Sequence, residues 1–188
     1  RIITQAEVPE LLPMRECIDV MAETLKTVAR GEAVLPLRTL VWLPDKSGLL
    51  GLMPAHLGSP ACIGIKVVTV MPQNHGTEFD SHQGAVLLFE VAHGALLAVI
   101  DGSAVTAIRT AAVSGAATRA LARPQARDLA ILGSGVQAES HLEAMLAVRP
   151  IQRVRVWSAT PERCRRFAER GARRHGVAIE HAPDARAA

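Results

Sequence analysis

The chain has 188 residues, of which 49% are hydrophobic and 21% charged, and its formal net charge is +3. This length allows one sizeable domain or two small ones, and the balance excludes the disordered and fibrous classes. Three scattered cysteines and the absence of an apolar run near the roughly 20 residues of a membrane span predict a cytoplasmic protein without a membrane partner.

The first part of the chain combines helices with several strands. Apolar residues from Met14 to Val28 recur at helical spacing, and Gly31 stands where a glycine commonly ends a helix. An Ala- and Thr-rich helix from about Val105 to Leu121 comes later, and Pro124 marks a domain boundary. Between these helices, apolar stretches predict five strands, the last two joined as a hairpin: Leu37–Leu43, Leu49–Met53, Cys62–Val70, Ala85–Val91 and Ala95–Ile100. We therefore expect an α+β domain over residues 1–122.

From Asp128 onward strands and helices alternate, which indicates a parallel sheet. Thr160 can cap the second helix, with Pro161 at its first position, and Gly176 can end it. The arginines of that helix have no aromatic residues between them, which favours a solvated face over nucleic-acid binding. The predicted elements are Leu129–Leu132, Val136–Val148, Val154–Trp157, Pro161–Arg174 and Val177–Ile179.

This alternation predicts the first βαβαβ half of a Rossmann dinucleotide-binding domain over residues 123–188. The predicted fold class is therefore α/β. The second half of such a domain does not follow, and we expect the chain to represent part of a longer protein.

The segment Gly133–Ala138 reads GSGVQA and fits the dinucleotide-binding pattern G-x-G-x-x-A. Gly133 permits the tight turn, Gly135 lets the backbone approach the pyrophosphate, and Ala138 keeps the helix close to the sheet. The pyrophosphate is then expected on the free N–H groups of the helix. Because the pattern follows an apolar strand and opens a helix, we favour dinucleotide binding over a structural glycine turn. The expected binding residues are Gly133, Ser134, Gly135, Val136, Gln137 and Ala138.

The end of the second strand of this half predicts the choice of cofactor. NAD-selective sites usually carry an acidic residue there, whereas this chain has Ser158, Ala159 and Thr160, with Arg163 one turn away. No carboxylate repels a 2′-phosphate, and the hydroxyls can donate to it. The sequence therefore favours NADP(H) over NAD(H), unless Ser158 and Thr160 only cap the helix.

Three basic residues are candidates for chemistry on a small acid. Lys66 is the only charge in an apolar strand, where partial burial readily lowers the pKa of a lysine, although it can also lie at a sheet edge and reach solvent. Arg38 and Arg109 suit a bidentate grip on a carboxylate, or else structural ion pairs. His82 can line the pocket, relay a proton or be structural. The histidines lack the spacing of metal ligands, and we expect no metal.

Several segments, taken together with the GSGVQA turn, resemble the ornithine cyclodeaminase/mu-crystallin family. The similarity covers nearly the whole chain and is nearer to the ketimine reductases of the family than to the strict cyclodeaminases. The matching segments are Ile65–Val67, Ser81–Gln83, Leu87–Glu90, Ala98–Gly102 and Thr106–Ala112.

The resemblance implies an N-terminal substrate and dimerisation domain, a Rossmann domain after it, an active site between them and a homodimer. It implies that Arg38, Lys66 and Arg109 hold an amino- or imino-acid substrate, that Lys66 is catalytic, and that Thr110 lies beside the nicotinamide or its phosphates. The implied reaction transfers hydride at the α-carbon. The alternatives are an ornithine cyclodeaminase with recycled NAD, and a non-catalytic NADPH-binding protein of the crystallin type.

Overall fold

The computed structural model describes all 188 residues and divides into two compact units. The first unit comprises Arg1–Leu12 and Glu23–Thr106, and the second comprises Pro13–Ala22 and Ala107–Ala188. Two of the boundaries between the units fall within helices, Met14–Ala29 and Gly102–Leu121. The predicted division into a substrate domain and a dinucleotide-binding domain after residue 122 stays a prediction.

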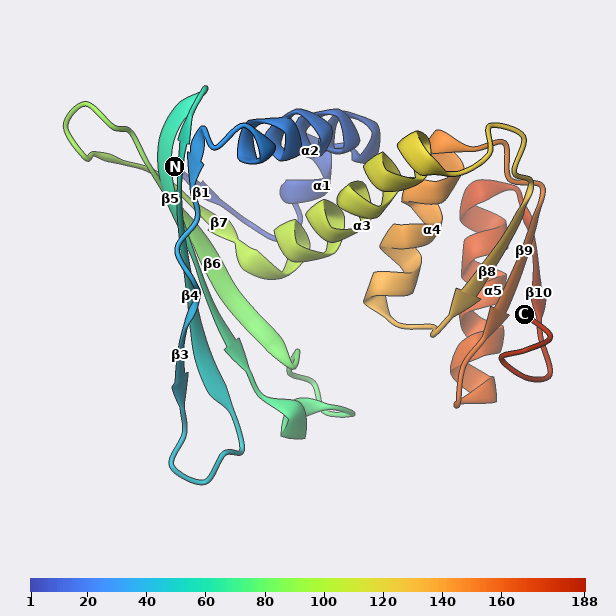
Figure 1. Cartoon of the computed structure of the whole chain (residues 1–188). Coiled ribbons are helices and arrows are strands. Elements are labelled where there is room, and N and C mark those ends of the chain that lie inside the picture. The colour runs from blue at the N-terminus through green and yellow to red at the C-terminus, as the bar shows by residue number, and fades with distance from the viewer. The chain divides into compact units, whose positions relative to one another are not determined.

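The first unit is built on a mixed sheet of seven strands in the order β1-β7-β6-β5-β4-β2, with β3 also paired to β4 (Figure 1). All neighbours are antiparallel except β1 and β7. The strands are β1 (Ile2–Ile3), β2 (Ala33–Val34), β3 (Thr39–Trp42), β4 (Leu49–Gly58), β5 (Ala61–Val70), β6 (His82–Phe89) and β7 (Leu96–Asp101).

The register of this sheet defines two faces. Lys66 of β5 lies opposite Met53 of β4 and Val86 of β6, and Val86 lies opposite Ile100 of β7. Directly opposed residues project to the same side of a sheet. These residues therefore share one face, which we call the lysine face, and their neighbours along each strand form the opposite face.

Short helical elements and the start of a long helix complete the first unit. The helix α1 spans Val8–Leu11 and the 3-10 turn η1 spans Pro72–Asn74. The long helix α3 spans Gly102–Leu121, and the Asp101 carboxylate accepts a hydrogen bond from the Ala104 N–H at 2.7 Å. Asp101 thus acts as the N-cap that positions the first turn of α3.

The second unit contains a parallel sheet of three strands in the order β10-β9-β8 with two helices beside it (Figure 1). Ion pairs join Arg170 to Glu139 and Arg174 to Glu143, so the two helices lie side by side. The elements are β8 (Asp128–Leu132), α4 (Val136–Val148), β9 (Arg153–Trp157), α5 (Pro161–His175) and β10 (Ala178–His181). The βαβαβ connectivity is that of a mononucleotide-binding half.

Apolar side chains between this sheet and its helices form the core of the second unit. Phe167 and Leu142 are almost fully buried, and they come from α5 and α4. The other core residues are Ile131, Val154, Val156, Cys164 and Val177. Val154 and Val156 of the central strand β9 are fully buried, as a parallel sheet covered by helices requires.

Small residues let the helices of the second unit pack closely. Helix α2 spans Met14–Ala29, and its Ile18 side chain lies 3.0 Å from where a Cβ on Gly115 of α3 would stand. The Cβ of Ala144 in α4 lies 3.5 Å from the same point. The alanine-rich composition of α3 therefore reflects close helix packing, with Ala111 and Ala112 fully buried.

The predicted helices and strands are present, with differences at several of their bounds. Strand β4 continues to Gly58, and β3 begins only at Thr39, so Arg38 precedes the strand. His82, which lies before the predicted strand Ala85–Val91, is the first residue of β6. Thr160 holds the N-cap position of α5 without a side-chain hydrogen bond, so the predicted hydroxyl cap is wrong.

The helix-ending glycines are confirmed, since Gly31 and Gly176 both have positive φ angles. None of the helices combines the length and the apolar character needed to span a membrane.

Candidate functional site

The turn between β8 and α4 has the geometry that the sequence predicts for a phosphate-binding loop. Gly133 has φ +119°, which favours glycine, and its N–H donates to the Trp157 carbonyl at 2.7 Å. Gly135 is the N-cap residue of α4, and a Cβ there would meet no atom within 4 Å. The space above the turn is therefore open to a ligand.

The start of α4 offers unpaired hydrogen-bond donors. No side chain caps this helix, and the first turn of any helix has N–H groups without intrahelical partners. Val136 and Gln137 are both exposed there. A cavity of about 460 Å³ adjoins the turn, lined by Gly133, Gly135, Gln137, Ala138 and His141 together with β8 and Met145. Free N–H donors and the positive end of a helix dipole are the features that suit an anion.

The carboxyl end of β9 lies against the same turn, because parallel strands end at one edge of a sheet. The Ser134 hydroxyl donates to the Ser158 oxygen at 3.0 Å, and the Ser158 hydroxyl donates to the Thr160 carbonyl at 3.1 Å. Two hydrogen bonds therefore hold the Ser158 side chain, and its hydroxyl proton is used in the bond to the Thr160 carbonyl. The Thr160 hydroxyl makes no capping bond.

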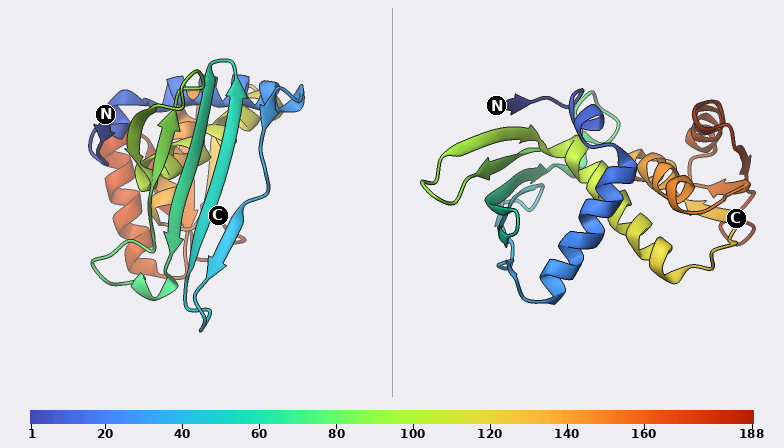
Figure 2. Two further views of the ribbon diagram at one scale, coloured as in Figure 1. Left: turned by 90° about the vertical axis from the view of Figure 1, so that its left-hand side faces the viewer. Right: turned by 90° about the horizontal axis from the view of Figure 1, so that it is seen from above.

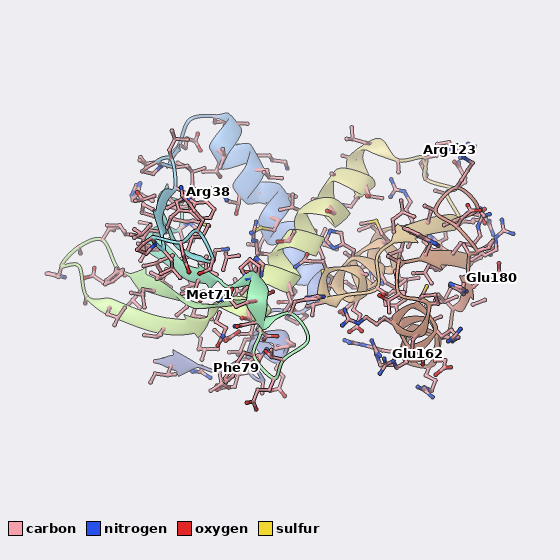
Figure 3. The ribbon with its side chains drawn as sticks, turned by 90° about the horizontal axis from the view of Figure 1, so that it is seen from below. Arg38, Met71, Phe79, Arg123, Glu162 and Glu180 are labelled. Atoms are coloured by element: carbon pink, nitrogen blue, oxygen red, sulfur yellow. The ribbon has the colours of Figure 1, made fainter.

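Charges beside this edge come from the first turns of α5. Arg163 is the third residue of the helix, and Glu162 beside it bonds Arg165 at 2.5 Å. That bond, and the charge of Arg165, hold the pKa of the Glu162 carboxyl below its usual range. Figure 3 labels Glu162 on α5. The expected cofactor residues Ser158, Ala159, Thr160 and Arg163 thus lie on one short segment next to the Gly133–Ala138 turn.

Thr110 carries a buried hydroxyl without a partner. Its Oγ1 atom is the one buried side-chain polar atom of the chain that makes no hydrogen bond. An unsatisfied buried hydroxyl is costly, so such an atom points to a ligand that is bound in the functional state. That Thr110 lies beside a dinucleotide stays a prediction, and Arg109 precedes it on α3.

In the first unit, Lys66 is positioned by the start of α3. Its ammonium donates to the Thr106 hydroxyl at 3.3 Å, across the lysine face. Leu40 of β3 lies opposite Gly51, which lies opposite Val68, so Leu40 shares this face. Figure 3 labels Arg38, which is exposed just before β3. The first unit thus holds two of the cations that the sequence predicts to bind an acid, Lys66 on the lysine face and Arg38 just before β3.

His82 shares the lysine face but stands apart from Lys66. It lies opposite Val70, four residues along β5 from Lys66, which corresponds to about 13 Å at the usual rise of a strand. Its Nδ1 lies 3.1 Å from the Ser81 hydroxyl, and its carbonyl accepts from Ser103 at 2.9 Å. The structure thus does not bring His82 to Lys66, and a role in proton transfer stays a prediction.

Two further polar groups were not singled out in the sequence. Thr106 stands four residues before Thr110, a spacing that puts both on one face of a helix. His141 follows Gln137 by four residues on α4 and bonds the Gln137 carbonyl at 2.7 Å. The sequence signal that could have found them is their spacing of four residues from Thr110 and from Gln137. No group of three or more His, Cys, Asp or Glu side chains is placed to hold a metal ion.

Comparison with known proteins agrees with this arrangement. The profile of the ornithine cyclodeaminase/mu-crystallin family matches residues 1–188. The chain belongs to this family. Mouse ketimine reductase mu-crystallin is 43% identical over 138 residues, which are 73% of this chain and 44% of the mouse protein.

One further relative and one solved structure are similar to a larger share of this chain. Delta(1)-pyrroline-2-carboxylate reductase of Bacillus cereus is 35% identical over 168 residues, covering 89% of this chain and 52% of that protein. The structure of the Thermococcus litoralis Delta(1)-pyrroline-2-carboxylate reductase in complex with NADH and L-proline has a TM-score of 0.94 and 32% identity, over 98% of this chain and 57% of that one. The chain thus spans about half the length of the relatives it matches, and its α/β fold class is confirmed.

Proposed function

We propose that this member of the ornithine cyclodeaminase/mu-crystallin family serves the NAD(P)H-dependent reduction of a small cyclic ketimine or imino acid. The observation that carries the proposal is the glycine turn at Gly133–Ala138, which opens a helix with uncapped N–H groups beside a parallel strand. Reductases among the relatives support the reaction class.

The residues of the second unit suit a nicotinamide dinucleotide. The N–H groups at the start of α4 would hold its pyrophosphate, and the unpartnered Thr110 hydroxyl would donate to it. Because Ser158 has committed its proton to the Thr160 carbonyl, the Thr160 hydroxyl and the Arg163 guanidinium are the donors for a 2′-phosphate. This donor set, with no acidic residue at 158–160, favours NADP(H) over NAD(H).

The substrate carboxylate is assigned to arginines. A guanidinium binds a carboxylate through two parallel hydrogen bonds, and Arg38 and Arg109 are both exposed and able to do so. In this proposal the lysine face presents Lys66 to the imine end of the same molecule. His82 would line the more distant part of that face.

The dinucleotide, when bound, supplies the hydride that reduces the imine carbon. The imine nitrogen must also gain one proton, and the Lys66 ammonium is the acid that this chain offers. The Lys66 ammonium donates a hydrogen bond to the Thr106 hydroxyl at 3.3 Å, and this bond helps to orient the ammonium. Thr106 therefore orients the acid, and Lys66 is the catalytic residue of the proposal.

The test is oxidation of NADPH by the full chain with Delta(1)-pyrroline-2-carboxylate, compared between the wild-type protein and Lys66→Met. We expect kcat/KM to fall about 100-fold or more, as removal of a general acid does, while NADPH still binds. Lys46→Met is the matched control, because Lys46 is an exposed lysine that lies over the Trp42 ring.

Other outcomes separate the alternatives. Release of ammonia and proline from ornithine, without net change in the cofactor, would identify a cyclodeaminase. Binding of NADPH with turnover that Lys66→Met leaves unchanged would favour a non-catalytic binding protein.

A homodimer is proposed for the first unit. The sheet face opposite the lysine face exposes several large apolar side chains, among them Val41 at 53%, Ile63 at 43% and Leu96 at 52%. Such a patch is typical of an interaction surface. We expect the chain to sediment at twice its 20.0 kDa, and Ile63→Asp to yield the monomer. A monomeric wild-type chain would contradict the dimer.

A further inference from the structure

A chain of hydrogen bonds joins α3 to α4 beside the glycine turn. The Ser114 hydroxyl of α3 lies 3.0 Å from Nε2 of His141, and Nδ1 of His141 lies 2.7 Å from the Gln137 carbonyl oxygen. A carbonyl oxygen only accepts, so Nδ1 carries the proton. In the neutral ring, Nε2 then accepts the one proton of the Ser114 hydroxyl, at 3.0 Å, in place of the Thr110 carbonyl oxygen that lies 3.4 Å from the same hydroxyl. With the Ser114 proton directed to Nε2, the imidazole has a defined tautomer and orientation.

Both ends of this chain belong to the parts assigned to the dinucleotide. Gln137 lies in the glycine turn motif, and His141 lines the cavity of about 460 Å³ next to that turn as its only ionisable side chain. Ser114 lies one helical turn after Thr110, and its hydroxyl is 3.4 Å from the Thr110 carbonyl. His141 of α4 is therefore hydrogen-bonded to α3, the helix that carries the buried Thr110 hydroxyl.

We infer that His141 is a positioning residue for the dinucleotide, which fixes the first turn of α4 relative to Thr110 on α3. The inference rests on the proposed function. A turn with Gly133 and Gly135 has little conformational preference of its own. The helix that follows has no side-chain cap. The direction of its free N–H groups thus depends on contacts such as the one from His141 to Gln137.

The direction of the free N–H groups of α4 determines how strongly they bind a phosphate. Hydrogen bonds weaken steeply as their angle departs from linearity. A first turn of α4 that is free to tilt would still bind a phosphate, but with poorer angles to its N–H groups. Loss of the His141 contacts is therefore expected to weaken dinucleotide binding in a protein that remains folded.

The experiment measures the Kd of NADPH and of NADH by nicotinamide fluorescence on the full chain. His141→Phe keeps a ring of similar size and removes both hydrogen bonds, and we expect both Kd values to rise about tenfold or more. Ser114→Ala removes one bond and is expected to raise them about threefold to fivefold. His175→Phe is the matched control, because His175 lies at the end of α5 and lines a different cavity.

Two variants distinguish positioning from packing. His141→Asn places an amide N–H near the position of Nδ1 and is expected to recover most of the affinity that His141→Phe loses. Ser114→Ala is expected to add nothing in the His141→Phe background, because the acceptor is already absent. In the chain without cofactor, ¹⁵N spectra are expected to show a protonated Nδ1 and a bare Nε2 on His141.

Folded His141→Phe and Ser114→Ala proteins with wild-type Kd values would overturn the inference, while leaving the proposed function intact. Additive effects of the two substitutions, or a proton on Nε2, would also overturn it. A wild-type chain that binds neither NADPH nor NADH would overturn the proposed function and this inference together.

Discussion

In the proposed cofactor site, Ser158 stands at the position where NAD-selective domains usually carry an acidic residue. An aspartate at this position would repel a 2′-phosphate and would accept hydrogen bonds from the ribose hydroxyls of NAD. We predict that Ser158→Asp raises the Kd of NADPH about tenfold or more and lowers that of NADH. Fluorescence titration with each cofactor measures both changes.

Ser158→Asn is the control for that substitution. It also loses the serine hydroxyl that bonds Ser134 and Thr160, but it adds no charge. If the ratio of the Kd values for NADPH and NADH changes equally in Ser158→Asp and Ser158→Asn, the serine hydroxyl governs the selectivity, and the absence of a carboxylate does not.

His175 gives the stability of the second unit a pH dependence. Burial, reinforced by the neighbouring charge of Arg174, lowers the pKa of this histidine from its ordinary 6.5, despite the opposing effect of Glu143. The folded state thus binds the proton less tightly than the unfolded state. The stabilising contribution is present above about pH 6.5 and is lost as the pH falls through the folded pKa.

We expect the free energy of unfolding, measured by urea denaturation, to decline below pH 6.5. His175→Gln should remove this part of the decline and leave the carboxylate-dependent part at lower pH. An identical profile for the two proteins would refute the assignment.

Arg149 joins two elements of the second unit. Its guanidinium donates to the carbonyls of Thr118, Arg119 and Ala122, at 2.7, 2.9 and 2.7 Å, and to that of Arg123 at 3.0 Å. These are the carbonyls at and just beyond the end of α3, which a helix leaves without intrahelical donors. A cation at this end also complements the helix dipole.

We predict that Arg149→Ala lowers the free energy of unfolding by about 2–4 kcal/mol, because several charge-assisted hydrogen bonds are lost together. Arg149→Lys should recover only part of this, since one ammonium cannot reach all the carbonyls. The exposed Arg173→Ala is the control, expected within about 0.5 kcal/mol of the wild type. Comparable losses in Arg149→Ala and Arg173→Ala, in thermal or urea denaturation, would contradict the capping role.

Local sequence patterns predict most of the helices and strands of the fold. The alternation of strands and helices after Asp128 predicts the parallel sheet, and the helix after the glycine turn has its predicted bounds, Val136–Val148. The signals failed where a distant partner decides the structure. Strand β4 continues to Gly58 because β5 pairs with it along its whole length, and neither Pro54 nor His56 reveals this pairing locally.

The candidate site was predictable to a similar degree. The glycine turn and Ser158 were found because their function requires particular residue types at fixed spacing. The roles of Thr106, Ser114 and His141 depend on contacts between elements distant in sequence, such as the bond of Lys66 to Thr106 across 40 residues. No pattern within one element reveals such contacts.

For the molecule as a whole, the fold places two kinds of chemistry in two units. The first unit contains the seven-stranded sheet with Lys66, and Arg38 just before one of its strands; the second contains the glycine turn, Thr110 and the Ser158–Arg163 segment. The ribbons of the two sheets are drawn in Figures 1 and 2. Helix α3 contributes residues to both units. Substrate and dinucleotide binding are therefore expected to respond separately to substitution, with Lys66 governing turnover and the glycine turn governing affinity for the cofactor.

The proposed function requires the Gly133–Ala138 turn to bind a nicotinamide dinucleotide, and fluorescence titration of the full chain with NADPH measures this binding. We predict saturable binding by the wild-type protein and its loss in Gly135→Val, because a Cβ there clashes with no protein atom and would obstruct only the ligand. Circular dichroism of the variant should remain that of the wild type. Equal binding by the two proteins, or none by the wild type, would contradict the claim.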